Sequence, residues 1–97
     1  MKKIIFEWDE NKAEKNLRKH NVSFEEAQTV FFDEDAVQFW DEKHSHSEDR
    51  FLMLGMSSRP RLLLVVHCYR EKEETIRIIS ARKATKREQR EYSGDSL

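Results

Sequence analysis

A cluster of basic residues lies near the end of the chain, in the stretch "RIISARKATKREQREY" from residue 77 to 92. Its cationic side chains are Arg77, Arg82, Lys83, Lys86, Arg87 and Arg90. A guanidinium group matches phosphate oxygens with paired hydrogen bonds and stays charged at every relevant pH. The stretch therefore indicates a site for an anionic ligand. The alternative that these residues leave open is the solvated face of a short helix.

Two further side chains could complete a site around these arginines. His67 and Tyr69 lie two residues apart in the strand-like run "RLLLVVHCYR", so they are expected on one face of that strand. A histidine can move a proton near neutral pH, and a tyrosine ring can stack on an unpaired base. RNA carries its own nucleophile in the 2′-hydroxyl, so its cleavage needs only proton transfer and positive charge at the phosphate. Equally, His67 could be a hydrogen-bonded wall residue of the sheet, and Arg77 an ordinary surface residue.

Other residues of metal-ligand or nucleophilic type have weaker support. The "HSH" motif has Asp41 and Glu48 nearby but lacks a recognised metal-ligand spacing, so no metal site is predicted. Cys68 lies in an apolar strand, has no histidine partner placed by motif, and is expected to be buried. No cofactor is predicted, and the chain has no glycine-rich phosphate loop.

These residues must be positioned by a fold that begins with a strand and a helix. "KKIIFEW" at 2–8 is rich in β-branched and aromatic residues, as strands are. Asp9 is a plausible N-cap for a helix over about 10–20, and Asn21 suits the left-handed residue that ends such a helix. The inner face of this helix is expected to hold Ala13 and Leu17.

A second helix follows at once. Ser23 can accept a hydrogen bond from the amide of Glu26, whose carboxylate can reach back, which makes a capping box. The helix is predicted to run to about Phe32. Its core-facing residues are Phe24, Ala27, Val30 and Phe31. Trp8, Trp40 and most of the phenylalanines are also expected in the core.

Four strand-like runs and a last helix fill the rest of the chain. The runs are 36–40, 50–57, 61–70 and 74–81, and hairpin-length connections join the last three. Thr85 and Glu88 form a capping box for a helix from Lys86 to about Tyr92. The order predicts a single α+β domain over 1–92, followed by a flexible tail at 93–97. Its antiparallel β-sheet, a meander, would carry the two N-terminal helices on one face and leave the other face partly open to solvent.

Side-chain alternation along the strands predicts which residues share a face. Over 74–81, one face would hold Ile76, Ile78 and Ser80, and the other Thr75, Arg77, Ile79 and Ala81. Over 61–70, the more apolar face would hold Leu62, Leu64, Val66 and Cys68. If the isoleucines cover the helices, Arg77 projects from the open face with His67 and Tyr69, and Arg82 and Lys83 lie just past the strand end.

Composition limits the class of protein. The chain has 97 residues, enough for one modest core, and a single cysteine, which fits a reducing compartment. It has no apolar run near the ~20 residues that span a membrane and no signal peptide, so a soluble cytoplasmic protein is expected. Residues 1–58 contain eight Lys and Arg against thirteen Asp and Glu, whereas residues 59–90 contain ten against four. This polarity permits a basic nucleic-acid surface, or simply charges spread over a solvated exterior.

Four blocks of the chain resemble the BrnT toxin family. "FEWDENKAEKNLRKHNVSFEEA" at 6–27 is similar to the family's N-terminal signature of a strand end and two helices. "EDRFLMLGMS" at 48–57, "LLVVHCYR" at 63–70 and "RIISARKATKREQREY" at 77–92 are similar to its remaining blocks, in the same order and spacing. The resemblance covers about residues 4 to 92.

The resemblance implies both a fold and a function. BrnT proteins are the toxins of type II toxin–antitoxin modules, with a fold related to the RelE-like ribonuclease toxins. They cleave RNA and so block translation, by chemistry that requires no metal. A BrnA antitoxin with a ribbon-helix-helix DNA-binding domain neutralises the toxin, and the complex represses its own operon through the antitoxin's contact with operator DNA.

The resemblance also suggests roles for individual residues. The functional arginines of the last block fall on Arg77 and Arg82, its lysine on Lys83, and the histidine of the preceding block on His67, which leaves the general base open. The flanking RNA would be gripped by Tyr69, Lys86, Arg87 and Arg90. Asn21 stands where many relatives have glycine, and the low isoelectric point is unusual for such toxins.

The prediction from the sequence is therefore a metal-independent endoribonuclease toxin. Arg77 and Arg82 would hold the scissile phosphate and stabilise its extra charge, with His67 as candidate acid or base and Lys83 as further electrostatic help. The rival hypotheses are a non-catalytic module that docks a basic face on nucleic acid or on an acidic partner, and a degenerate toxin that only binds its partner.

Overall fold

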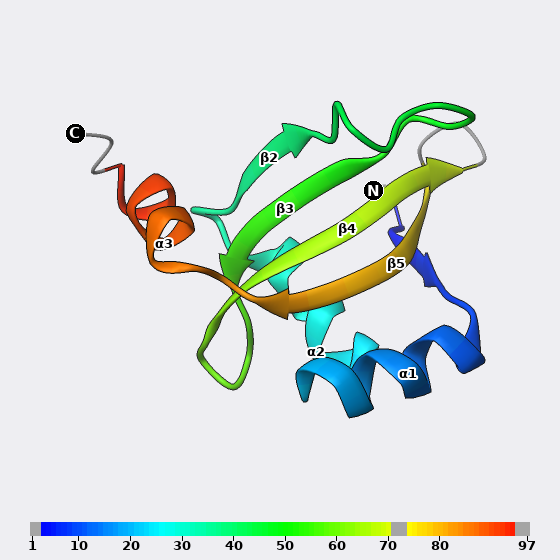
Figure 1. Cartoon of the computed structure of the whole chain (residues 1–97), viewed down its shortest axis with the longest axis horizontal. Coiled ribbons are helices and arrows are strands. Elements are labelled where there is room, and N and C mark those ends of the chain that lie inside the picture. Colours follow the sequence, from blue (N-terminus) through cyan, green and yellow to red (C-terminus); the bar gives the residue numbers. More distant parts are fainter. Residues whose placement is uncertain (1–2, 71–73, 95–97) are drawn as a thin grey trace.

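The computed structural model describes residues 3–70 and 74–94, which form one α+β domain (Figure 1). The elements in chain order are strand β1 (Ile5–Glu7), helices α1 (Glu10–His20) and α2 (Phe24–Thr29), the 3-10 helix η1 (Val30–Phe32), strands β2 (Val37–Trp40), β3 (Phe51–Met56), β4 (Leu62–Arg70) and β5 (Thr75–Lys83), and helix α3 (Lys86–Ser93). The predicted order of elements is confirmed. The connection at 71–73 and the end of the predicted tail, 95–97, lie outside the described residues.

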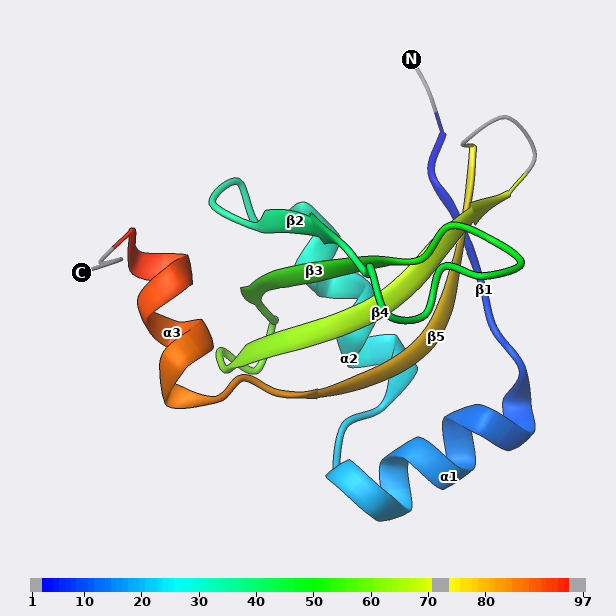
Figure 2. The ribbon, with the colours of Figure 1, turned by 45° about the horizontal axis from the view of Figure 1, so that its top comes forward.

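The five strands form one mixed sheet in the order β1-β5-β4-β3-β2. The four later strands make the predicted antiparallel meander, while β1 pairs parallel with β5. The prediction of a wholly antiparallel sheet is therefore wrong at this edge. Figure 2 shows the reason: after β1 the chain passes through α1 and α2 on one side of the sheet and enters β2 at the opposite edge.

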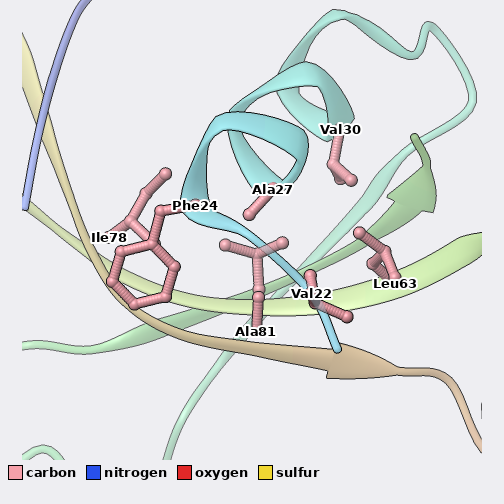
Figure 3. Packing of buried hydrophobic residues seen from close by; sticks show 8 residues of the cluster. Val22, Phe24, Ala27, Val30, Leu63, Ile78 and Ala81 are labelled. Carbon is pink, nitrogen blue, oxygen red and sulfur yellow. The ribbon is translucent and has the colours of Figure 1, made fainter. Parts of the chain in front are cut away.

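The core lies between α2 and the centre of the sheet (Figure 3). The buried cluster comprises Val22, Phe24, Ala27 and Val30 from the helical side and Leu63, Val65, Ile78 and Ala81 from β4 and β5. Each large apolar side chain buried in this way stabilises the fold by about 1.5–3 kcal/mol relative to an exposed one. The helices therefore cover the face of β4 that carries Leu63 and Val65.

The prediction for the two faces of β4 is thus wrong. The face with Leu64 and Cys68 was expected to pack against the helices. The helices pack instead against the face with Leu63 and Val65. Leu64 and Cys68 are nevertheless buried, with 5% and 2% of their surface exposed. Because β4 is a central strand with apolar side chains on both faces, its hydrophobic pattern could not decide which face meets the helices.

A β-bulge in β5 changes the alternation halfway along the strand. Val66 pairs with Ser80 and His67 with Ile78, so Ile79 is the extra residue. After the bulge, Ala81 rather than Ser80 joins the helical core, contrary to the prediction. The bulge also moves Arg82 to the face opposite the helices, which is the face that carries Arg77.

Strand β5 is longer than predicted. Arg82 pairs with Leu64 and Lys83 with Leu63, and the amide of Ala84 donates to the carbonyl of Leu62 (2.9 Å). Arg82 and Lys83 therefore belong to the strand rather than lying past its end. Since paired residues project to the same side of a sheet, Lys83 lies on the helical face with Leu63, and Arg82 on the other.

Asn16 of α1 supports β5 where β1 no longer covers its edge. Its amide nitrogen donates to the carbonyls of Val22 (2.9 Å) and Ala81 (2.8 Å), and its oxygen accepts from the amide of Ala81 (3.1 Å). Asn16 is buried, whereas Leu17, predicted for the inner face of this helix, is 48% exposed. The inner face of α1 is therefore partly polar, which hydrophobic spacing did not reveal.

The predicted helix ends are largely confirmed. Asp9 and Ser23 accept hydrogen bonds as N-caps, and Asn21 ends α1 in the left-handed conformation (φ 57°). Thr85 and Glu88 form the full capping box of α3, which extends one residue beyond Tyr92 to Ser93 and is capped by Gly94.

The carboxylate of Glu26 does not complete the capping box that was predicted with Ser23. It accepts hydrogen bonds from Nε and Nη2 of Arg61 (2.8 and 2.6 Å) and from the hydroxyl of Ser57 (2.6 Å). These hydrogen bonds, with those from Arg61 strongest, hold the pKa of Glu26 below its ordinary value despite its burial. Glu26 therefore ties α2 to the β3–β4 hairpin.

Several aromatic residues lie outside the core. Phe32 is 65% exposed and Trp40 is 54% exposed, contrary to the prediction for Trp40, while Trp8 packs against the core edge-on to Phe24. In the part of the chain that the structure describes, no helix has the length and apolar character needed to cross a membrane.

Candidate functional site

A groove of about 500 Å³ lies on the face of the sheet opposite α1 and α2. Its apolar floor is formed by Leu52, Leu64, Val66 and Ile79 of the three central strands. Its polar rim is formed by Asp41, Lys43, His44 and Arg50 of the β2–β3 loop and by Ser80 and Arg82 of β5. The groove thus combines an apolar floor with four basic or imidazole side chains, and we refer to it as the sheet groove.

Arg82 lies at the rim of the sheet groove and links β5 to α3. Its Nη1 donates to Oε1 of Glu88 (2.8 Å) and to the carbonyl of Lys83 (3.2 Å), and its Nη2 donates to Oε2 of Glu88 (2.9 Å). The hydrogen bonds to Glu88 raise the pKa of Arg82 above its ordinary value. A guanidinium has five N–H donors, and within the described residues the two that remain, on Nε and Nη2, have no protein partner. This edge can still hold a phosphate with two hydrogen bonds.

Arg77 lies on the same face of the sheet but not in the groove. Its Nη1 donates to Oε2 of Glu7 on β1 (2.9 Å), and Nε of Arg70 lies 3.8 Å from the same oxygen. Arg77 pairs with Cys68 and Arg82 with Leu64, four residues away on β4. At about 3.3 Å per residue, the two backbone positions are about 13 Å apart. The face that was predicted for Arg77 is therefore correct, but the two arginines do not converge on one point.

His67 is buried on the helical side of the sheet, so it does not share a surface with Arg77 as was expected. Its ring packs edge-on against Phe31 with centroids 4.8 Å apart, and its residue exposure is 0%. Nδ1 lies 3.1 Å from the carbonyl of Val65, and Nε2 lies 2.9 Å from Oε1 of Gln38. Burial lowers the pKa of His67 to about 4, so the ring is neutral at pH 7. The alternative of a hydrogen-bonded wall residue describes it better.

Tyr69 also lies on the helical side of the sheet, next to His67. Its hydroxyl donates to Oε1 of Gln38 (2.6 Å), and its ring packs against Phe51 and His67 with centroid distances of 5.4 Å in both cases. This aromatic group is half-buried at one end of the sheet and belongs to a different face from the sheet groove.

The remaining basic residues are exposed on and before α3. Lys83 ends β5, and the exposed positions of the helix include Lys86, Arg87 and Arg90. The helix faces the body of the protein through Glu88 and Tyr92, which are four residues apart and so lie on one side. The hydroxyl of Tyr92 donates to Oδ2 of Asp33 (2.7 Å), and this hydrogen bond raises the pKa of Tyr92 to about 12. The basic side of α3 is therefore left to solvent. Figure 1 shows the helix beyond the end of β5.

The β2–β3 loop contributes side chains that the sequence did not single out for this site. Nδ1 of His44 lies 3.0 Å from Oδ2 of Asp41, and the His44 side chain is 63% exposed while that of Asp41 is 12% exposed. The Nε atom of Arg50 is buried and has no hydrogen-bond partner among the described residues. In the sequence this pair is visible only as an aspartate three residues before a histidine.

The described residues do not form a metal-binding cluster. Across residues 3–70 and 74–94, no group of three or more His, Cys, Asp and Glu side chains is placed to hold a metal ion. Cys68 is buried as predicted, and burial raises the pKa of its thiol. The groups that remain for chemistry on this face are therefore the cations and the imidazole around the sheet groove.

Comparison with known proteins identifies the family. Residues 8–88 match the family described as the ribonuclease toxin, BrnT, of a type II toxin–antitoxin system. The structure is similar to a crystal structure of the ribonuclease toxin BrnT from Brucella abortus, with a TM-score of 0.63 and 25% sequence identity over 89% of this chain and 100% of the other. No curated protein sequence gives a significant match. The match over most of its length shows that the chain belongs to the BrnT family of ribonuclease toxins.

Proposed function

We propose that this protein is the toxin of a type II toxin–antitoxin module and that it cleaves RNA along the sheet groove. The single observation that carries this proposal is the gathering of Lys43, Arg50 and Arg82 around one groove with an apolar floor. An RNA strand can lay its bases on such a floor and its phosphates along such a rim. Family membership supplies the class of substrate.

The proposed reaction is attack of the RNA 2′-hydroxyl on the adjacent phosphate, which needs no metal ion. Arg82 would bind the scissile phosphate through its Nε and Nη2 edge and stabilise the negative charge that develops there. Glu88 binds the other edge of the guanidinium and leaves this edge free. In this proposal Arg82 is the principal electrostatic residue.

The other cations would act on the rest of the strand. Arg77, about 13 Å along the sheet, is better placed for a flanking phosphate than for the scissile one. The exposed side of α3, with Lys86, Arg87 and Arg90, would grip RNA beyond the groove, and Lys83 would add to the positive potential. His67 and Tyr69 have supporting positions in the sheet and are left out of the catalytic set.

We also propose that a BrnA-like antitoxin with a ribbon-helix-helix domain neutralises the toxin in the cytoplasm and represses the operon with it. RNA cleavage would then stop translation when the antitoxin is lost. The outer edges of β1 and β2 offer backbone groups to which an antitoxin segment could add a strand. Co-expression of the neighbouring gene product should restore growth and give a stable complex.

The experiment that tests this function maps RNA ends after induction of wild-type protein, Arg82→Ala and the control Arg18→Ala, which changes an exposed arginine on α1. Wild type and the control should produce new RNA ends and stop growth. Arg82→Ala should cut at least 10²-fold more slowly, as expected for loss of an electrostatic group at the reacting phosphate. Equal cutting by all three proteins would rule out the Arg82 assignment. RNA that is bound but never cut would favour the alternative of a non-catalytic binding module.

A further inference from the structure

The proposed reaction needs a group that accepts the proton of the 2′-hydroxyl, and His67 is buried on the wrong face. The chain contains three other histidines. His20 borders a separate hollow against α1, lined by Lys12, Lys15 and Lys19. His44 is the histidine that lines the sheet groove. We propose that His44 is the general base of the RNA cleavage and that Asp41 is its positioning residue; this inference rests on the proposed function.

The contact with Asp41 fixes which nitrogen of His44 can react. Nδ1 lies 3.0 Å from Oδ2 and 3.2 Å from Oδ1 of the carboxylate. A carboxylate only accepts hydrogen bonds, so Nδ1 carries the proton and donates. In the neutral ring Nε2 then keeps its lone pair and is the nitrogen that can take a proton. The pairing of an exposed imidazole with a largely buried carboxylate is the arrangement that orients a histidine base.

The loop that carries His44 is closed at its base. The amide of Asp41 donates to the carbonyl of Arg50 (2.8 Å), which joins the two ends of the loop. The hydroxyl of Ser45 donates to the carbonyl of Asp41 (2.6 Å) and accepts from the amide of Arg50 (3.0 Å). The amide of His44 also donates to the carbonyl of Asp41 (3.4 Å). His44 therefore lies on a loop that is held by its own internal hydrogen bonds.

The same loop also supplies positive charge beside the base. The buried Nε of Arg50 is a donor without a hydrogen-bond partner among the described residues, and the carboxylate of Glu48 is 3.9 Å away. A buried donor left in this way is costly unless a ligand or water satisfies it. Arg50, Lys43 and Arg82 line the groove with His44. A phosphate bound among them would bring the 2′-hydroxyl of the adjoining ribose into the groove that the imidazole lines.

The proposed step balances as follows. Nε2 of His44 takes the proton from the 2′-hydroxyl, and the 2′-oxygen forms a bond to phosphorus. The bond between phosphorus and the 5′-oxygen breaks, and the leaving oxygen takes a proton from water. The products are a 2′,3′-cyclic phosphate and a 5′-hydroxyl. The protonated imidazole is stabilised by the carboxylate of Asp41 until it returns its proton to water.

The test uses the purified full chain and a short RNA that contains a mapped cleavage site. His44→Gln keeps a donor for the Asp41 carboxylate but cannot take the proton, and His44→Ala removes the ring. His46→Ala is the matched control, because it removes an exposed histidine from the same loop. Cutting should fall about 10²–10⁴-fold in both His44 variants and stay unchanged in the control. Added imidazole should restore part of the cutting by His44→Ala.

Asp41→Asn tests the positioning role. It should lower kcat at least tenfold while KM and the melting temperature stay close to wild type, because the carboxylate acts on the imidazole and not on the RNA. Equal kcat values for wild type, His44→Gln and Asp41→Asn would overturn this inference while leaving the proposed ribonuclease function standing. A wild-type protein that cuts no RNA would instead overturn the proposed function, and the inference with it.

Discussion

The two faces of the sheet carry the same types of polar group at different depths. The helical face has the ion pair of Glu26 with Arg61 and the buried His67, and the groove face has the ion pair of Glu88 with Arg82 and the exposed His44. The side chains of Glu26 and Arg61 are 3% and 21% exposed, and those of Glu88 and Arg82 are 24% and 39% exposed. Because a buried polar group must be satisfied by the protein and an exposed one need not be, we expect the first pair to act on stability and the second on ligands.

The largest expected effect is a loss of stability when the buried ion pair of Glu26 with Arg61 is broken. Glu26→Ala removes the carboxylate that accepts hydrogen bonds from Arg61 and Ser57. Breaking a buried ion pair costs about 3–5 kcal/mol. The free energy of unfolding in urea should fall by about that amount. Glu25→Ala, which removes an exposed carboxylate from the same helix, should change it by less than about 0.5 kcal/mol. Equal losses of stability in the two variants would show that the burial of Glu26 does not determine its contribution.

A smaller effect is expected from the buried histidine, as a dependence of stability on pH. Burial lowers the pKa of His67 from 6.5 to about 4, so between these values the unfolded chain binds a proton that the folded chain does not. Stability is therefore lost as pH falls through this window and levels off below about pH 4. From pH 7 to pH 5 the contribution of His67 should be about 2 kcal/mol.

Urea unfolding at the two pH values, in wild type and in His67→Gln, measures this contribution. The variant should lose less stability than wild type on acidification, because glutamine does not titrate. An equal loss in the two proteins would mean that other groups cause the acid sensitivity. The variant should also keep its RNA cleavage, in contrast to His44→Gln.

The smallest expected effect on stability concerns the more exposed pair, Glu88 with Arg82. Glu88→Gln keeps a hydrogen-bond acceptor for Arg82 but removes the charge, and exposed ion pairs contribute about 0–1 kcal/mol. The melting temperature should therefore change little. RNA binding should become tighter or stay the same, because the guanidinium loses a competing anion; a filter-binding titration would show this. Weaker RNA binding at unchanged stability would mean that Glu88 positions Arg82 for the phosphate.

The parts of the fold that depend on neighbouring residues in the chain could be predicted from the sequence. The caps at Asp9, Ser23, Asn21 and Thr85 are local devices, and each was placed correctly. The carboxylate of Glu26 was misassigned, because its partner Arg61 lies 35 residues away and competes with the local capping position. Local signals therefore fixed where the helices begin, while distant partners decided which way side chains turned.

The site was harder to predict, for two physical reasons. Both faces of β4 are apolar and buried, so alternation gave two equivalent choices for His67. The bulge at Ile79 has no glycine or proline to mark it, and it changes the face of every later residue of β5. His44 was considered only as a metal ligand, because the hydrogen bonds that brace its loop join residues whose pairing the sequence does not indicate.

Because of the bulge at Ile79, the face on which Arg82 lies depends on the number of residues between Arg77 and Arg82. Straightening the strand without changing its number of residues would turn Arg82 toward the helices and Ala81 toward the groove. In relatives with an unbroken strand, an arginine that serves this groove should therefore occur at an even spacing from Arg77, instead of the odd spacing seen here.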